Sequence, residues 1–267
     1  MKKKILATVL SISMLAINQF SSIAAPIGPG YENCQEQTSG VITTYLKDVY
    51  KKTTNPVYDE IVYKAFDKFE SNKESANPIV IYKGTDEECS ALELYITENY
   101  GYTTDMLVYR YQVYDRGQNY SQLEFTNSLN ADQKINDYLN EVKNAKTLAD
   151  SLKKDSDEET FKNIVSWVHN NFEYNHEATT LPPELELNAY YGGYSGKKVI
   201  CAGYAMAVYQ LCAMNGIEGY LYSGYVPGGV HKICSAVING NEIFADPTNT
   251  SVLYNAMPED FTAICKH

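Results

Sequence analysis

A cysteine opens an apolar helix in the segment Val199-Ile200-Cys201-Ala202-Gly203-Tyr204-Ala205. The small residues after the cysteine would let this helix pack closely on a sheet. A helix N-terminus presents unpaired backbone amides and a partial positive charge, and both stabilise a thiolate. We therefore predict a helix over residues 201–215, ended by Gly216, that holds a reactive thiol at its first residue.

Three strand-like runs follow this helix: Tyr220–Val226, Val230–Ile238 and Glu242–Asp246. The last two are joined by Asn239-Gly240, a strong short-range signal for a β-hairpin. If these two residues form the turn, His231 and Asp246 become diagonal neighbours on one face, within side-chain reach. A three-residue turn without a bulge would place them on opposite faces.

Cys201, His231 and Asp246 supply a thiol, an imidazole and a carboxylate within about a fifth of the chain. These are the parts of a thiolate nucleophile with a general base and an orienting acid. Each residue taken singly has a plainer interpretation: a buried or disulfide-bonded cysteine, a polar residue at a strand edge, and the start of an Asp-Pro-Thr turn. Their order, the helix start and the hairpin register together favour the catalytic interpretation.

The part of the chain before residue 130 predicts a small α+β region. Thr85 and Glu88 resemble a capping box that starts a helix ending near Gly101. Apolar spacing and alternation predict further helices over residues 41–49 and 61–69, and strands over 79–82, 106–114 and 122–126. A long amphipathic helix follows over 135–152, and Ser156 with Glu159 marks the start of another.

The first residues predict a secretory signal peptide. Lys2-Lys3-Lys4 precede a short apolar stretch, and Ser22-Ile23-Ala24 supplies small residues before a cleavage point. We expect a secreted, extracellular protein, either free or associated with the cell surface. Removing those three lysines from a net charge of −11 leaves −14. So acidic a surface argues against nucleic acid or an anionic membrane as partner. The partner that we expect is a protein or peptide substrate.

We therefore expect three parts: residues 1–24 as signal peptide, 25–130 as an N-terminal α+β region, and 131–267 as the catalytic domain.

Secretion permits disulfides among the six cysteines. If Cys201 is a nucleophile, an odd number remains, so at least one other is a free thiol. Cys201 and Cys212 lie roughly 16 Å apart on one helix and cannot bridge each other. The pairing among the others stays open: Cys34, Cys89, Cys212, Cys234 and Cys265.

No cofactor and no catalytic metal are expected. His169 and His176 are possible ligands, but surface placement is the better interpretation of both. The chain carries neither a Cys-x-x-Cys nor a His-Glu-x-x-His pattern.

The C-terminal motifs resemble the transglutaminase-like superfamily over about Glu158 to Thr250, roughly a third of the chain. The matching segments are Trp167-Val168…Tyr174, Val199–Ala205, Asn215-Gly216-Ile217, His231 and Asp246-Pro247-Thr248. The resemblance implies a papain-like α+β core, in which the Cys helix packs on an antiparallel sheet carrying His and Asp on adjacent strands. By that match Cys201 would be the nucleophile, His231 the base and Asp246 the orienting acid, acting on amides through a thioester.

Two departures from the family concern the sheet. Members commonly follow the histidine with Ala-Trp-Asn, where this chain has Lys232-Ile233-Cys234. They also usually carry an aromatic early in the next strand, where Glu242 and Ile243 stand here. Both changes bear on the shape of the cleft and on substrate preference.

The sequence thus predicts a cysteine-dependent acyl-transfer enzyme acting on peptide or glutamine-type amides. A water acceptor would make it a protease, amidase or deamidase, and a lysine acceptor a cross-linker; hydrolysis is favoured. A second hypothesis is an inactive secreted binding module, consistent with the altered strand and with the Tyr-rich loop at residues 189–196. A third is a structural protein with all six cysteines in disulfides.

Overall fold

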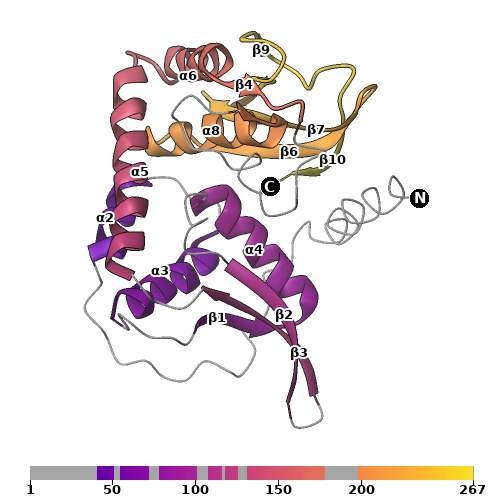
Figure 1. The fold of residues 1–267 in the computed structure, drawn as a ribbon. Coiled ribbons are helices and arrows are strands. Elements are labelled where there is room, and N and C mark those ends of the chain that lie inside the picture. Colours follow the sequence, from indigo (N-terminus) through magenta and orange to yellow (C-terminus); the bar gives the residue numbers. More distant parts are fainter. Residues whose placement is uncertain are drawn as a thin grey trace.

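The computed structural model describes residues 41–50, 55–71, 78–100, 108–115, 118–125, 131–177 and 198–266. The predicted signal peptide, Cys34 and the Tyr-rich loop lie outside these residues. The described chain is an α+β protein with a three-stranded sheet in its N-terminal half and a five-stranded sheet in its C-terminal half (Figure 1). Among its helices, none combines the length and the apolar character needed to cross a membrane.

The N-terminal half packs helices against a small antiparallel sheet with strand order β1-β3-β2. Its elements are α2 (Val41–Val49), α3 (Pro56–Ser71), β1 (Ile79–Gly84), α4 (Asp86–Tyr100), β2 (Val108–Asp115) and β3 (Gln118–Phe125). The predicted capping box starts α4: the Glu88 amide donates to Thr85 Oγ1 (3.2 Å), and the Thr85 amide donates to Glu88 Oε2 (2.8 Å). The sequence therefore predicted each of the helices and strands that the structure describes in this half.

The C-terminal half is built on a five-stranded antiparallel sheet with strand order β10-β6-β7-β8-β9. Its strands are β6 (Gly219–Val226), β7 (Gly229–Ile238), β8 (Asn241–Ala245), β9 (Leu253–Tyr254) and β10 (Thr262–Lys266). The three central strands match the prediction. The edge strands β9 and β10 were missed, because they are short and become strands only by pairing with β8 and β6. A small parallel ladder joins β4 (Glu173–Tyr174) to β5 (Lys198–Val199).

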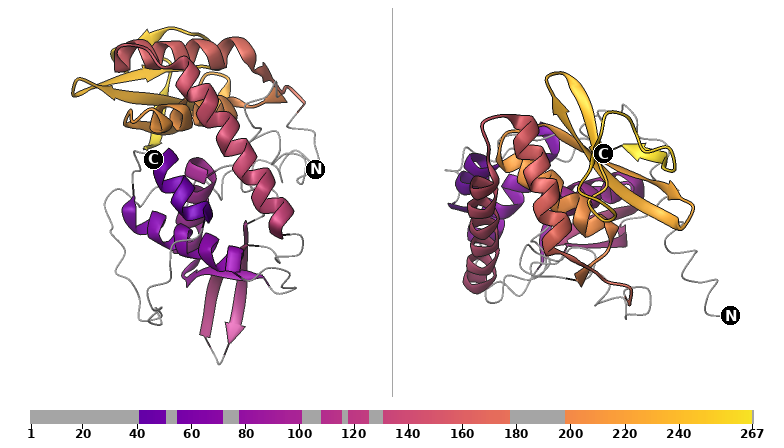
Figure 2. Two further views of the ribbon diagram at one scale, coloured as in Figure 1. Left: turned by 90° about the vertical axis from the view of Figure 1, so that its left-hand side faces the viewer. Right: turned by 90° about the horizontal axis from the view of Figure 1, so that it is seen from above.

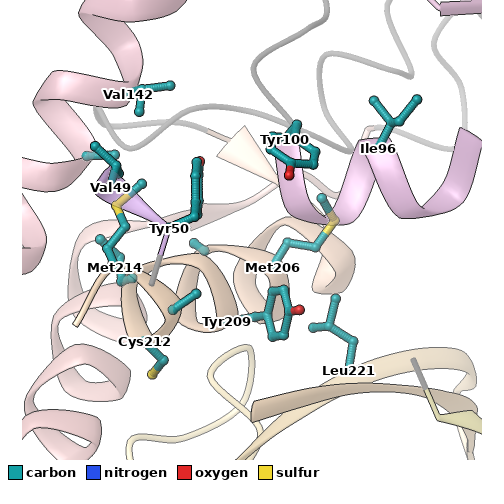
Figure 3. Close-up of a cluster of buried hydrophobic side chains, with 14 of the residues drawn as sticks. Val49, Tyr50, Ile96, Tyr100, Val142, Met206, Tyr209, Cys212, Met214 and Leu221 are labelled. Atoms are coloured by element: carbon teal, nitrogen blue, oxygen red, sulfur yellow. The ribbon is translucent and has the colours of Figure 1, made fainter. Parts of the chain in front are cut away.

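Helix α8 (Cys201–Met214) lies at the centre of this half, and every residue after Cys201 is buried. A helix that is apolar on all sides is stable only when it is surrounded. One side of α8 faces the sheet through Leu221 of β6, and the other faces α4 through Ile96 and Tyr100 (Figure 3). The helix that carries the predicted nucleophile is therefore fixed by packing from both halves.

Helix α5 (Ala131–Leu152) runs along both halves of the molecule (Figure 2). It buries one stripe, which includes Tyr138, Val142 and Ala149, within the same hydrophobic core that contains α8. Its neighbour α6 (Asp157–Asn171) begins with the predicted capping box, in which Ser156 Oγ accepts from the Glu159 amide (3.2 Å). The N-terminal and C-terminal halves thus share a continuous apolar core.

Candidate active site

Cys201 is the first residue of α8, as predicted, and is half-buried. The residue before it, Ile200, has an extended backbone and no side chain able to cap the helix. The Ile200 side chain therefore leaves the first amides of α8 uncapped, although the Gly203 amide donates to the Ile200 carbonyl (2.9 Å). Such amides and the helix dipole stabilise negative charge, both on a thiolate and on the oxyanion of a tetrahedral intermediate.

The β7–β8 hairpin has the predicted two-residue turn. Asn239 (φ 52°) and Gly240 (φ 79°) both have positive φ, as a type I′ turn requires. Ile238 pairs with Asn241, and the register continues to the pair of Cys234 and Ala245. The predicted register is confirmed.

This register brings His231 and Asp246 together. His231 Nε2 lies 2.9 Å from Asp246 Oδ2, and the two residues are only 7% and 8% exposed. Because Nε2 contacts the carboxylate, Nδ1 is the ring nitrogen left for a second partner. The imidazole also meets the edge of Phe261, at 6.4 Å between ring centroids. Carboxylate and aromatic ring together fix the orientation of the imidazole.

The second partner of His231 is the Cys201 side chain. Burial alone would lower the pKa of His231, but hydrogen bonds to Asp246 and Cys201 and the negative charge of both raise this pKa from 6.5 to about 10. Burial would raise the pKa of Asp246, yet the hydrogen bonds from His231 and Asn249 and the charge of His231 lower it. Both directions favour a protonated imidazole beside the Asp246 carboxylate, and the hydrogen bond from Cys201 to the same ring brings all three predicted residues together.

Two residues to which the sequence gave no role at this site contact Asp246 or the turn that it begins. Asn249 donates through Nδ2 to Asp246 Oδ2 (2.7 Å), and its backbone amide donates to the Asp246 carbonyl (3.1 Å). His169 donates through Nδ1 to the Pro247 carbonyl (3.0 Å). Surface placement was therefore wrong for His169, which this contact holds half-buried, whereas His176 is exposed. Asp246 thus both follows β8 and begins the Asp-Pro-Thr turn.

Tyr174 lies against the start of α8, because its strand β4 pairs in parallel with β5 immediately before Cys201. The backbone amide of Cys201 donates to the Tyr174 hydroxyl. Burial and the charge of Cys201 raise the pKa of Tyr174, so the phenol keeps its proton. The sequence signal for Tyr174 was only its place in the family motif. The structure therefore places one hydroxyl donor, that of Tyr174, beside the backbone amide of Cys201.

The other cysteines bear on the disulfide question. Cys201, Cys212 and Cys234 are free thiols. Burial, followed by nearby charges, raises the pKa of Cys212 and of Cys234, so both remain protonated and inert. The hypothesis that all six cysteines form disulfides is therefore wrong.

In the described ranges, no cluster of three His, Cys, Asp or Glu side chains is arranged to hold a metal ion.

A thiol at a helix start, with an imidazole and a carboxylate carried by the adjoining antiparallel sheet, defines a papain-like α+β arrangement. Residues 143–244 match the family model DUF553, a transglutaminase-like domain. These residues are therefore similar to the transglutaminase-like family, which agrees with the resemblance of the motifs. The match contains Cys201 and His231, ends just before Asp246, and supports a cysteine-dependent enzyme in general terms.

Two solved structures are similar over part of the chain. A transglutaminase (TGase) crystal structure is 15% identical with a TM-score of 0.36, covering 52% of this chain and 44% of its own. A candidate cysteine protease from Cytophaga hutchinsonii is also 15% identical with a TM-score of 0.36, covering 61% of this chain and 66% of its own. The chain thus spans less than two thirds of either protein. A search of curated proteins finds no match.

Proposed function

We propose that this protein is a cysteine-dependent acyl-transfer enzyme that attacks peptide or glutamine-type amides through a thioester, with water as the usual acceptor. One observation carries the proposal: His231 contacts both Asp246 and the Cys201 side chain at the N-terminus of α8. A buried imidazole held between a carboxylate and a thiol is suited to moving a proton between sulfur and a leaving group.

The first half-reaction forms the thioester. The Cys201 thiolate attacks the carbonyl carbon of the amide, and the carbonyl oxygen becomes an oxyanion. The donors that we assign to this oxyanion are the amide of Cys201 and the hydroxyl of Tyr174, which contact each other at the start of α8. The His231 imidazolium then gives its proton to the leaving nitrogen, the C–N bond breaks, and ammonia or an amine departs. Neutral His231 remains beside the acyl-enzyme.

The second half-reaction releases the acyl group. Neutral His231 takes a proton from the acceptor as the acceptor attacks the thioester carbon. The C–S bond breaks, which returns the thiolate and the imidazolium. Water yields a carboxylic acid, and a lysine amine would yield an isopeptide. Water is the default acceptor because it reaches any site that is not closed against it.

Incubation with peptides that contain glutamine and lysine, followed by mass spectrometry, tests this proposal. Hydrolysis of the peptide bond gives fragments, deamidation gives a small mass gain without cleavage, and cross-linking gives a summed mass. We expect cleavage or deamidation from the wild type and neither from Cys201→Ala. Wild-type protein that leaves every peptide unchanged would instead favour the binding module.

A thiol-reactive amide probe tests the role of His231 separately. Labelling at Cys201 should be fast in the wild type and slow in His231→Ala, because the imidazole holds the thiol in its reactive form. Labelling that is indifferent to this substitution would contradict the proposed pair. Cys212→Ala is the matched control, since its thiol is buried on the same helix.

We further propose that the enzyme works outside the cell, after removal of residues 1–24. The support is the order of lysines, apolar residues and small residues at the start of the chain. N-terminal sequencing of protein from the culture medium should find a start near residue 25.

A further inference from the structure

A buried ion pair joins the two halves at β7, the strand that carries His231. Lys232 of β7 donates through Nζ to Glu98 Oε1 of α4 at 2.5 Å. Lys232 is 6% exposed and Glu98 is 4% exposed. Lys232 follows His231 in the chain, so this pair places a buried cation next to the proposed base.

The same end of α4 is also bonded to α8. Gln210 of α8 donates through Nε2 to the Glu98 carbonyl (2.8 Å). Tyr209 of α8 donates through its hydroxyl to Asn99 Oδ1 (2.8 Å). One helix end from the N-terminal half therefore contacts both the helix that begins with Cys201 and the strand that carries His231.

Electrostatics make this contact sensitive to the loss of either charge. The carbonyls at the end of α4 carry a partial negative charge, and the Glu98 carboxylate adds a full one. The Lys232 ammonium is attracted to both. Removing one member of a buried pair takes a counter-charge away from the other member, whereas removing both members leaves no such imbalance. Successive side chains of a strand point to opposite faces of the sheet. Lys232 can therefore bind Glu98 on one face while His231 contacts Asp246 on the other.

We infer that Glu98 is a positioning residue, which holds the start of β7 through Lys232 and so keeps His231 aligned with Cys201 and Asp246. This inference rests on the proposed function, and it makes the N-terminal half part of the catalytic unit. Helix α4 of the same chain then supports the half that contains Cys201, His231 and Asp246.

A double-mutant cycle in the full-length protein tests the inference, using Glu98→Leu, Lys232→Met and the double variant. The first measurement is kcat and KM in the peptide assay, at a temperature where circular dichroism shows each variant folded. The second is the NMR titration of the His231 imidazole, assigned by the signal lost in His231→Asn. Glu60→Leu is the matched control, because Glu60 forms an exposed pair with Lys64 (3.2 Å) on α3.

We expect E98L to lower kcat between about tenfold and a hundredfold with KM within about twofold, as a small misplacement of a catalytic group does. The His231 titration should move to lower pH, because the imidazole loses part of its contact with Asp246. K232M should act in the same direction. The double variant should recover most of both losses, and E60L should match the wild type.

Wild-type kcat and an unchanged His231 titration in folded E98L would overturn the inference, and so would losses in kcat that simply add across the cycle. If E98L alone does not fold, K232M and the double variant give the same comparison. An inactive wild type would overturn the proposed function only, since the His231 titration still reports on positioning.

Discussion

Each half of the molecule buries an aspartate that accepts hydrogen bonds from two side chains. In the N-terminal half, Asp59 Oδ1 accepts from the hydroxyls of Tyr95 and Tyr100, both at 2.6 Å. In the C-terminal half, Asp246 Oδ2 accepts from His231 (2.9 Å) and Asn249 (2.7 Å). Asp59 is 5% exposed and Asp246 is 8% exposed. The two aspartates are therefore alike in burial and in the number of side chains that donate to them.

The donors make the difference. Burial, then the charge of Asp59, raises the pKa of Tyr95 and of Tyr100, so neither phenol gives up its proton. That cluster is a fixed brace inside the N-terminal half. The imidazole beside Asp246 exchanges its proton near physiological pH when unperturbed, and it also touches a thiol. A buried carboxylate is useful for catalysis only when its partner can carry a proton to a neighbouring nucleophile.

The largest expected effect on kcat comes from removing the nucleophile or the base. Cys201→Ala and His231→Ala should each lower kcat by about 10⁴-fold or more, because the residues act as one unit. Initial rates in the peptide assay measure this. Cys212→Ala should stay within about twofold of the wild type. Appreciable turnover by the Cys201 variant would place the chemistry elsewhere.

Removing one charge from each cluster gives the next largest effect and compares the halves directly. Asp246→Asn should lower kcat about a thousandfold, because the imidazole loses its orientation and its counter-charge. Asp59→Asn should leave kcat unchanged and lower the free energy of unfolding by about 1–3 kcal/mol, as the phenols lose a buried acceptor. Urea unfolding and kinetics on both variants measure this. Equal losses of kcat would erase the distinction between site and brace.

The Tyr174 hydroxyl should matter less than the triad. Tyr174→Phe removes one of two donors near the oxyanion, so kcat should fall between about tenfold and a hundredfold, with little change in KM. Tyr220→Phe, which loses an exposed hydroxyl bonded to Glu218, is the control. A change confined to KM would mean that Tyr174 binds substrate and does not stabilise the oxyanion.

Asn249 should have a smaller effect, because it acts through Asp246. Asn249→Ala should lower kcat about fivefold to tenfold, since one hydrogen bond to the carboxylate is lost. The pKa of Asp246 should rise toward its ordinary value, which NMR titration can follow. Asn171→Ala, at an exposed amide on α6, is the control. An unaltered Asp246 titration would show that the backbone turn alone holds the carboxylate.

The smallest effect is on the dependence of stability on pH. The pKa of His231 is raised from 6.5 to about 10, so its contribution is complete below pH 6.5 and is lost as the pH rises through about 10. The pKa of Asp246 is lowered, so its contribution is present above its ordinary value and is lost as the pH falls. Urea unfolding of wild type and His231→Asn from pH 5 to 10 measures this. Parallel stability curves would show that the imidazole has no favourable partner.

The sequence could predict most of the fold because its signals are local. The capping boxes at Thr85 and Ser156 depend on residues three positions apart, and both form as expected. The hairpin register depends on two turn residues, and it follows from Asn239 and Gly240. The short edge strand β10 escaped prediction, because it forms only by pairing with β6.

Order along the chain and periodicity were enough to specify the thiol at the start of α8 and the shared face of His231 and Asp246. The first depends on hydrogen bonds within one helix and the second on those across one hairpin, and residues inside each element determine both. The contact of Asn249 with Asp246, three residues away, is local as well. Only the tertiary structure could bring His169 to the Pro247 carbonyl and Tyr174 to the Cys201 amide. It also brought Glu98 to Lys232 across 134 residues. Contacts of that kind follow from how whole helices pack, and packing depends on the volume and polarity of the entire core.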